Sequence, residues 1–150
     1  MAERTLIIIK PDGIQRHFAG EIINRFEKKG LKLIGAKFFK PDIRLARKLY
    51  AIHKGKPFYE SQVKYLCSAP VLATVWQAPR VIEITRKMIG ATLGYESQPG
   101  TIRGDLGCAG GVNLVHGSDS AQSAKFEIAL FFKPEELVKY KLADERWLYD

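Results

Sequence analysis

The sequence has few cysteines and no long hydrophobic runs. Its two cysteines, Cys67 and Cys108, cannot form a disulfide framework, and their spacing and that of the three histidines match no zinc-ligand pattern. The longest apolar stretches, such as 71–76, are far shorter than the roughly 20 residues that a membrane span needs. The N-terminus lacks the basic segment followed by an apolar one that marks a secretion signal. We therefore expect reduced thiols, no membrane association and a cytoplasmic location.

The common nucleotide-binding loops are also missing. Neither G-x-x-x-x-G-K-[ST] nor G-x-G-x-x-G occurs, and the protein-kinase signatures are absent. Acidic residues are in the minority, since 24 Lys and Arg against 16 Asp and Glu give a formal net charge of +8. This balance favours a polyanionic partner, which could be nucleic acid, an acidic membrane or a phosphorylated small molecule. Charge does not choose among these partners, so the choice depends on local motifs.

Composition and periodicity predict one folded domain over residues 1–150. The chain is 46% hydrophobic and 27% charged, as globular domains are. Apolar, β-branched runs predict strands over 4–9, 31–39, 71–77 and 112–115. Helical spacing of apolar residues and terminal signals predict helices over 20–29, 44–52, 59–67, 80–89 and 121–131. This order predicts an α+β, ferredoxin-like sandwich: a four-stranded antiparallel sheet with helices packed on one face.

Segment 91–111 has no periodicity. Seven of the thirteen glycines lie between Gly90 and Gly111. We predict a long ordered loop there, and long loops inside compact domains are usually functional.

The segment 113–120, Asn-Leu-Val-His-Gly-Ser-Asp-Ser, carries the clearest chemical signal. It places His116 at the end of an apolar strand and shortly before a helix. Backbone N–H groups and the dipole at a helix start favour an anion beside the histidine. Neutral imidazole is a good nucleophile, so His116 could accept a phosphoryl group. On this segment alone, a strand-end histidine that only packs or caps is an equally simple interpretation.

Several cations could accompany this histidine. Arg103 is flanked by glycines, Lys10 stands where the first strand ends, and Arg86 lies in the last turn of a predicted helix. Each could instead be a solvated side chain, and a cation at a helix C-terminus is favourable without any ligand. Together they supply a nucleophile, fixed positive charge and a glycine-rich loop, which phosphoryl transfer requires.

Further motifs extend the pattern: Lys-Pro-Asp-Gly at 10–13, Gly-Glu-Ile-Ile at 20–23, Lys-Pro-Phe at 56–58 and Phe-Lys-Pro-Glu-Glu-Leu at 132–137. With Asn-x-x-His-Gly-Ser-Asp-Ser, they resemble the nucleoside diphosphate kinases over essentially the whole chain. The resemblance implies ping-pong transfer of the terminal phosphate of a nucleoside triphosphate, mainly ATP, to a nucleoside diphosphate. It also implies a phosphohistidine at His116, Mg²⁺ as cofactor and assembly as a homo-hexamer.

The resemblance implies a role for each matched residue. His116 matches the nucleophile, which in the family is phosphorylated on Nδ1. The other matches are Lys10 and Tyr50 beside the transferred phosphate, Phe58 stacked on the base, Arg86, Thr92 and Arg103 on phosphates, Asn113 on the ribose, Ser118 and Glu127 around the histidine, and Asp119 meeting Mg²⁺ through water. His17 and His53 match no role and are interpreted as ordinary side chains.

The sequence departs from the family's pattern in two places. Leu93-Gly94 replaces the usual Asn-Pro in a loop that helps build hexamer contacts, so this loop should be more flexible. Gly110 and Val112 stand where a larger apolar residue and an arginine are common, so nucleotide affinity should be weaker than in a typical member. The tail 147–150 is about as long as in hexameric members, which favours the hexamer.

Two other functions stay open beside the enzyme. One is a nucleic-acid-binding or regulatory protein on the same fold, which the net charge of +8 would favour. The other is transfer of the phosphate from the same histidine to another protein. Because every matched position is intact, we favour the enzyme and keep nucleic-acid binding as a secondary role.

Overall fold

The computed structural model describes residues 2–150. One sheet has the strand order β2-β3-β1-β4, formed by β1 (Glu3–Ile9), β2 (Lys32–Phe39), β3 (Val71–Ala78) and β4 (Val115–Gly117). Every neighbouring pair of strands is antiparallel. The predicted α+β, ferredoxin-like sandwich with a four-stranded antiparallel sheet is therefore confirmed.

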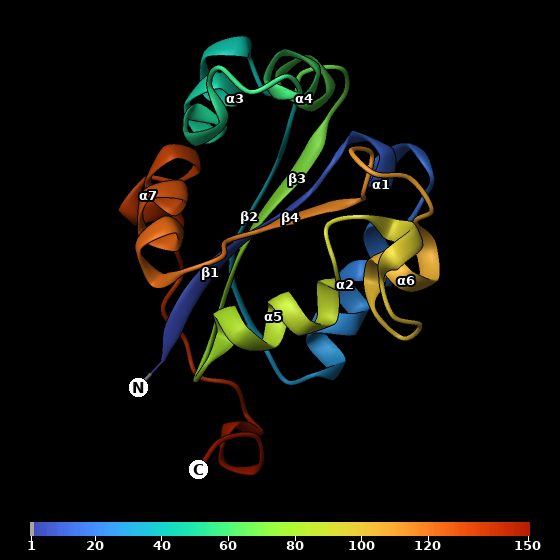
Figure 1. The fold of residues 1–150 in the computed structure, drawn as a ribbon. Coiled ribbons are helices and arrows are strands. Elements are labelled where there is room, and N and C mark those ends of the chain that lie inside the picture. Colours follow the sequence, from blue (N-terminus) through green and yellow to red (C-terminus); the bar gives the residue numbers. More distant parts are fainter. Residues whose placement is uncertain (1) are drawn as a thin grey trace.

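Helices connect and flank these strands (Figure 1). The α-helices are α1 (Pro11–Gln15), α2 (Ala19–Lys28), α3 (Ile43–Leu49), α4 (Tyr59–Leu66), α5 (Val81–Ile89), α6 (Ile102–Leu106) and α7 (Ala121–Phe131). Short 3₁₀ helices span Ala51–His53, Gly94–Glu96, Pro134–Glu136 and Glu145–Trp147. The predicted helices are all present, with small shifts at their ends.

Helices cover both faces of the sheet, not the single face that we expected (Figure 1). On one face, Leu6 and Ile8 pack with residues of α3, α4 and α7, a cluster called here the α7-side core. On the other face, Ile7 and Ile9 pack with residues of α2, α5 and α6, called here the α2-side core. A continuous apolar strand is buried on both faces, so the run Leu-Ile-Ile-Ile already contained this information.

The structure corrects the sequence prediction at three places. The last strand begins at Val115 rather than at residue 112, because Leu114 has φ of 73° and its N–H donates to the Asp12 carboxylate (3.1 Å) instead of to a strand. Helix α1 begins at Pro11, where the sequence predicted no helix, since proline fits the first position of a helix. Helix α6 lies inside the predicted loop and is capped by Thr101, whose Oγ1 accepts from Gly104 N. Both helices have five residues, too few for a periodic pattern.

Burial on both faces of β1 predicts that neighbouring residues of this strand matter equally for stability. Ile7→Ala and Ile8→Ala each remove a fully buried side chain and should each lower the free energy of unfolding by about 2–5 kcal/mol. Urea unfolding measures the loss. Arg4→Ala, at an exposed position of the same strand, should stay within about 0.5 kcal/mol of the wild type. Destabilisation by only one of the two isoleucine variants would contradict a sheet covered on both faces.

Candidate active site

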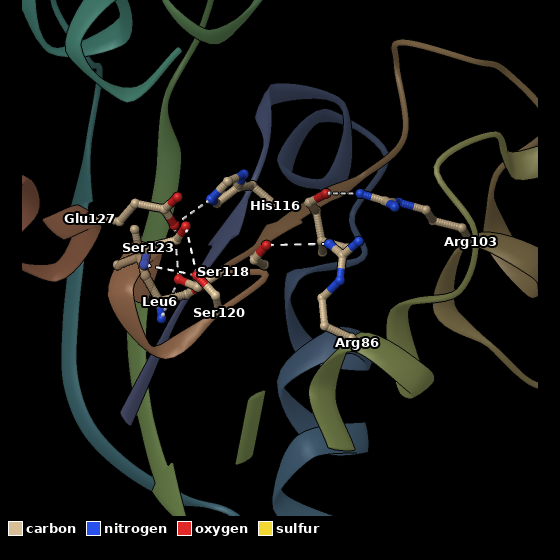
Figure 2. Close-up of polar contacts among 10 residues, drawn as sticks. Leu6, Arg86, Arg103, His116, Ser118, Ser120, Ser123 and Glu127 are labelled. Atoms are coloured by element: carbon tan, nitrogen blue, oxygen red, sulfur yellow. Dashed lines mark hydrogen bonds and ion pairs between the residues drawn. The ribbon is translucent and has the colours of Figure 1, made fainter. Parts of the chain in front are cut away.

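The pairing of β4 with β1 fixes the direction of His116. His116 lies directly opposite Ile8 in the antiparallel register, and opposite residues place their side chains on the same face of a sheet. Ile8 belongs to the α7-side core, so the imidazole also projects toward α7. Figure 2 shows the ring directed at Glu127, which α7 presents.

Glu127 holds the imidazole by one nitrogen. Oε1 of Glu127 lies 2.8 Å from Nε2 of His116 and accepts a second hydrogen bond from Ser118 Oγ, also at 2.8 Å (Figure 2). Ser118 is fully buried, and its Oγ accepts from Leu6 N at 3.2 Å. A proton on Nε2 completes the contact with the carboxylate, which leaves the lone pair on Nδ1. The chain Leu6–Ser118–Glu127–His116 therefore fixes both the orientation and the tautomer of the histidine.

The start of helix α7 is fixed by a cap, and this fixes the position of Glu127 on the helix. Ser120 caps the helix, since its Oγ accepts from Ser123 N at 3.0 Å. Ala124 and Phe131, on the buried side of the helix, pack in the α2-side and α7-side cores. Glu127 lies between them in sequence and is also buried, so its carboxylate is held close to the sheet.

Three predicted cations lie around the same space. Lys10 is 4% exposed, with Nζ 5.5 Å from the centre of the Tyr65 ring. The pKa of Lys10 is lowered to about 7, chiefly by burial and also by nearby Arg103, while Asp12 opposes both effects. Arg86 reaches β4 from α5 and donates from Nη1 to the carbonyl of Gly117 at 3.3 Å. The cations outnumber the nearby free carboxylates, which favours an anionic ligand.

Arg103 has a structural role as well as a charge. Its guanidinium donates to the carbonyls of Asn113 (3.1 Å), Ala91 (3.2 Å) and Val115 (2.7 Å), and so ties α6 to β4 and to the end of α5. The pKa of Arg103 is lowered to about 10, chiefly by burial and also by the nearby charge of Arg86. Two N–H groups remain for a ligand, since a guanidinium has five.

These groups line one cleft of about 580 Å³. The predicted site residues that line it are Lys10, Tyr50, Phe58, Arg86, Thr92, Arg103, Asn113, His116, Asp119 and Glu127. Ser118 lies behind Glu127 rather than on the wall. The structure therefore brings together every site residue that the sequence predicted, although they come from segments more than 100 residues apart.

The cleft also contains buried polar atoms without a partner among residues 2–150. They are the hydroxyl of Tyr50, Oδ1 of Asn113 and Nδ1 of His53. The amide nitrogen of Asn113 donates to the carbonyl of Thr92 at 2.8 Å, which leaves Oδ1 free to accept. Buried polar atoms normally have a partner, so these three atoms point to a polar ligand in the cleft.

His53 was interpreted from the sequence as an ordinary side chain, but it lines the cleft. It lies in the 3₁₀ turn between α3 and α4, one turn after Tyr50, and its ring is 5.2 Å from that of Phe58. Burial lowers the pKa of His53, and Lys56 contributes. Its position between two predicted site residues was the available signal, but no motif included it.

The far end of the cleft combines an aromatic ring with glycines. Phe58 is 45% exposed, although it is large and apolar, and it lines the cleft together with Gly110 and Gly111. Gly94, at the position of the missing proline, donates its N–H to the carbonyl of Ala109 at 2.9 Å. A Cβ at Gly94 would lie 2.7 Å from the backbone of Gly107, so the glycine permits this close approach. Higher flexibility of the loop and weaker nucleotide affinity stay predictions.

No group of three or more metal-ligating side chains occurs in the part of the chain that the structure describes. Asp119 lies at the edge of the cleft, and hydrogen bonding from Ser123 lowers the pKa of its carboxyl. Glu127 is occupied by His116 and Ser118. One free carboxylate fits a cation that is bound mainly by its ligand and not by the protein.

Comparison with known proteins shows the family of this chain. The family model "Nucleoside diphosphate kinase" matches residues 3–137. The chain belongs to the nucleoside diphosphate kinase family. It is 55% identical over 148 residues to a nucleoside diphosphate kinase of Staphylococcus carnosus, with 99% of each chain covered. It is 51% identical over 148 residues to one of Carboxydothermus hydrogenoformans, again with 99% of each covered.

Solved structures of the family share the fold. A halophilic nucleoside diphosphate kinase from Halobacterium salinarum in complex with CDP is 43% identical, with a TM-score of 0.98 and 100% of each chain covered. A transition-state mimic of the Borrelia burgdorferi enzyme with bound vanadate and ADP is 34% identical, with a TM-score of 0.91, covering 96% of this chain and 95% of that one. No helix among residues 2–150 combines the length and the apolar character required to cross a membrane.

The buried charge of Lys10 predicts a pH dependence of stability. The pKa of Lys10 is about 7 in the folded protein and near the usual 10.5 when unfolded. Between these values the unfolded chain binds a proton that the folded chain lacks, so the free energy of unfolding should rise with pH, by up to about 1.4 kcal/mol per pH unit. Below pH 7 the full cost of the buried charge remains.

Urea unfolding at pH 7 and at about pH 9.5 measures this gain, which Lys10→Met should lose. Lys29→Met, at an exposed position, should keep the pH dependence of the wild type. Equal pH dependence in Lys10→Met and the wild type would show that Lys10 is not the group responsible.

Proposed function

We propose that this chain transfers the terminal phosphate of a nucleoside triphosphate, mainly ATP, to a nucleoside diphosphate, through a phosphohistidine on Nδ1 of His116. The observation that carries the proposal is the fixed imidazole: Glu127 holds Nε2 and leaves Nδ1 as the nucleophilic atom beside the cations. The solved relatives that contain CDP, or ADP with vanadate, support a nucleotide in this cleft.

The transfer needs only one nucleophile. The Nδ1 lone pair forms a bond to the terminal phosphorus as the bond to the bridging oxygen breaks, and the nucleoside diphosphate leaves with that oxygen. The Nε2 proton stays on the imidazole and faces Glu127, which stabilises the ring as it gains positive character. A second nucleoside diphosphate attacks the phosphohistidine in the reverse step, and neutral His116 is restored.

The cations neutralise the charge of the transferred group. Lys10, Arg86 and Arg103 surround the space beside His116, and phosphate binding would restore the proton on Lys10 that burial disfavours. The unpaired Tyr50 hydroxyl can donate to a phosphate oxygen, and Thr92 lies on the same wall. These fixed charges and donors stabilise the transition state without reorganisation.

The other end of the cleft fits a nucleoside. Oδ1 of Asn113 is a buried acceptor without a partner, and a ribose hydroxyl would supply its proton. The half-exposed Phe58 ring offers a face for the base, and stacking of this kind tolerates every base. Gly110 and Gly111 also line the cleft. Because glycines have no side chain, they should contribute less to nucleotide affinity than a large side chain would.

Mg²⁺ is the cofactor that we propose for this reaction. It would bind the phosphates of the nucleotide, with Asp119 contacting it through water, and would neutralise the charge that develops on the leaving group. We also propose assembly as a homo-hexamer, which the resemblance to the family implies. Nucleic-acid binding as a secondary role and a cytoplasmic location stay predictions of the sequence.

Brief incubation with Mg-ATP without an acceptor tests the reaction. We expect one added phosphoryl group by intact-mass measurement, labile to acid, stable to alkali and removed by GDP. His116→Ala should bind ATP and gain no mass, whereas His17→Ala, on the turn after α1, should be phosphorylated normally. Binding of ATP without any adduct in the wild type would favour the nucleic-acid-binding or regulatory alternative.

The contact of Glu127 with the imidazole predicts a separate kinetic effect. Glu127→Ala should lower the rate of phosphohistidine formation about 10- to 100-fold, because the ring loses the partner that orients it. ATP affinity should change little, since Glu127 faces His116 and not the cations. Rapid-quench measurement at saturating ATP separates rate from affinity, with Glu60→Ala on the exposed side of α4 as control. An unchanged rate would exclude this positioning role.

A further inference from the structure

One polar side chain at the base end of the cleft takes no part in the phosphate chemistry described above. Gln62 lies on α4, and its backbone N–H donates to the carbonyl of Phe58 at 3.0 Å. Residues four apart on a helix lie on the same side, so the Phe58 ring and the Gln62 amide both face the cleft. Gln62 is half-buried and lines the cleft.

The amide reaches across the end of the cleft to the glycine-rich loop. A Cβ at Gly111 would lie only 2.6 Å from Nε2 of Gln62, so a glycine at this position leaves room for the amide. A Cβ at Gly110 would contact Leu93 at 3.2 Å and would not reach Gln62. The space beside Phe58 is therefore bounded by an aromatic ring, an amide and glycine backbone.

We propose that Gln62 binds the polar edge of the nucleobase stacked on Phe58, and that this contact favours adenine. The inference rests on the proposed function, since it needs a nucleotide in the cleft. A glutamine amide presents a donor and an acceptor side by side. Adenine presents the matching pair on both edges, through N6 with N7 and through N6 with N1. Guanine presents a matching pair only at O6 with N1–H, because its N7 and O6 are both acceptors. Adenine thus pairs with the amide whichever edge faces Gln62.

The effect should be moderate. Gln62 is only half-buried, so water competes with the base for the amide. Each net hydrogen bond is then worth about a 2- to 10-fold change in rate constant. Fully enclosed polar sites discriminate between substrates much more strongly, and we do not expect such strong discrimination between bases here.

The test compares a natural base with one that only stacks. Phosphoenzyme is prepared with ATP, freed of nucleotide and mixed with ADP, GDP or the riboside diphosphate of indole, whose base has no hydrogen-bonding edge. Gln62→Met keeps the length of the side chain and removes its polar end. It should lower kcat/KM for ADP about 2- to 10-fold, lower that for GDP less, and leave the indole compound unchanged. Gln15→Met, at the exposed end of α1, should change none of the three.

The ratio of ADP to the indole compound makes the test independent of folding. Partial unfolding of Gln62→Met would lower all rate constants equally and leave their ratios unchanged. An unchanged ratio of ADP to indole would overturn the inference, and an equal loss for ADP and GDP would overturn the preference for adenine. Failure of the wild type to form phosphoenzyme would instead overturn the proposed function.

Discussion

The antiparallel pairing of β4 with β1 is the constraint on which the site depends. It places His116 opposite Ile8, and the next residue on the same face, Ser118, bonds to the backbone of Leu6. Both side chains therefore reach Glu127 on α7. A shift of the register by one residue would turn the imidazole into the α2-side core, because side chains alternate between the faces of a sheet. The three paired positions of β4 and β1 thus direct the imidazole toward Glu127, which binds Nε2 and leaves Nδ1 free.

The charges of the cleft show the cost of this arrangement. Lys10 and Arg103 are buried, and the pKa of each is lowered chiefly because burial disfavours the charged form. Arg103 offsets part of its cost through three backbone carbonyls, whereas Lys10 has chiefly Asp12 as an opposing charge. A bound phosphate would offset the cost of burying both positive charges. The same burial that destabilises the free protein would strengthen the contacts of these cations with a bound anion.

The loop from residue 91 to 111 joins the charged end of the cleft to the end that holds Phe58 and Gln62. Its carbonyl at Ala91 and the neighbouring carbonyl of Asn113 bind Arg103, while Gly111 lies against Gln62. A side chain at Gly104 would collide with the carbonyl of Gln98, so the loop depends on glycine for its compact path. The segment with the least regular sequence is therefore an ordered wall, and α6 forms within it.

Local sequence determined the order and type of most elements and, through Asn-x-x-His-Gly-Ser-Asp-Ser, the family and the histidine that we propose as nucleophile. Apolar periods, glycines and caps act over a few residues and can be recognised in one dimension. The start of β4 and the places of His53 and Gln62 were decided by tertiary structure. They depend on contacts such as Leu6–Ser118 and Asp12–Leu114, between residues over 100 positions apart, and no local pattern encodes which distant partner a backbone group will meet.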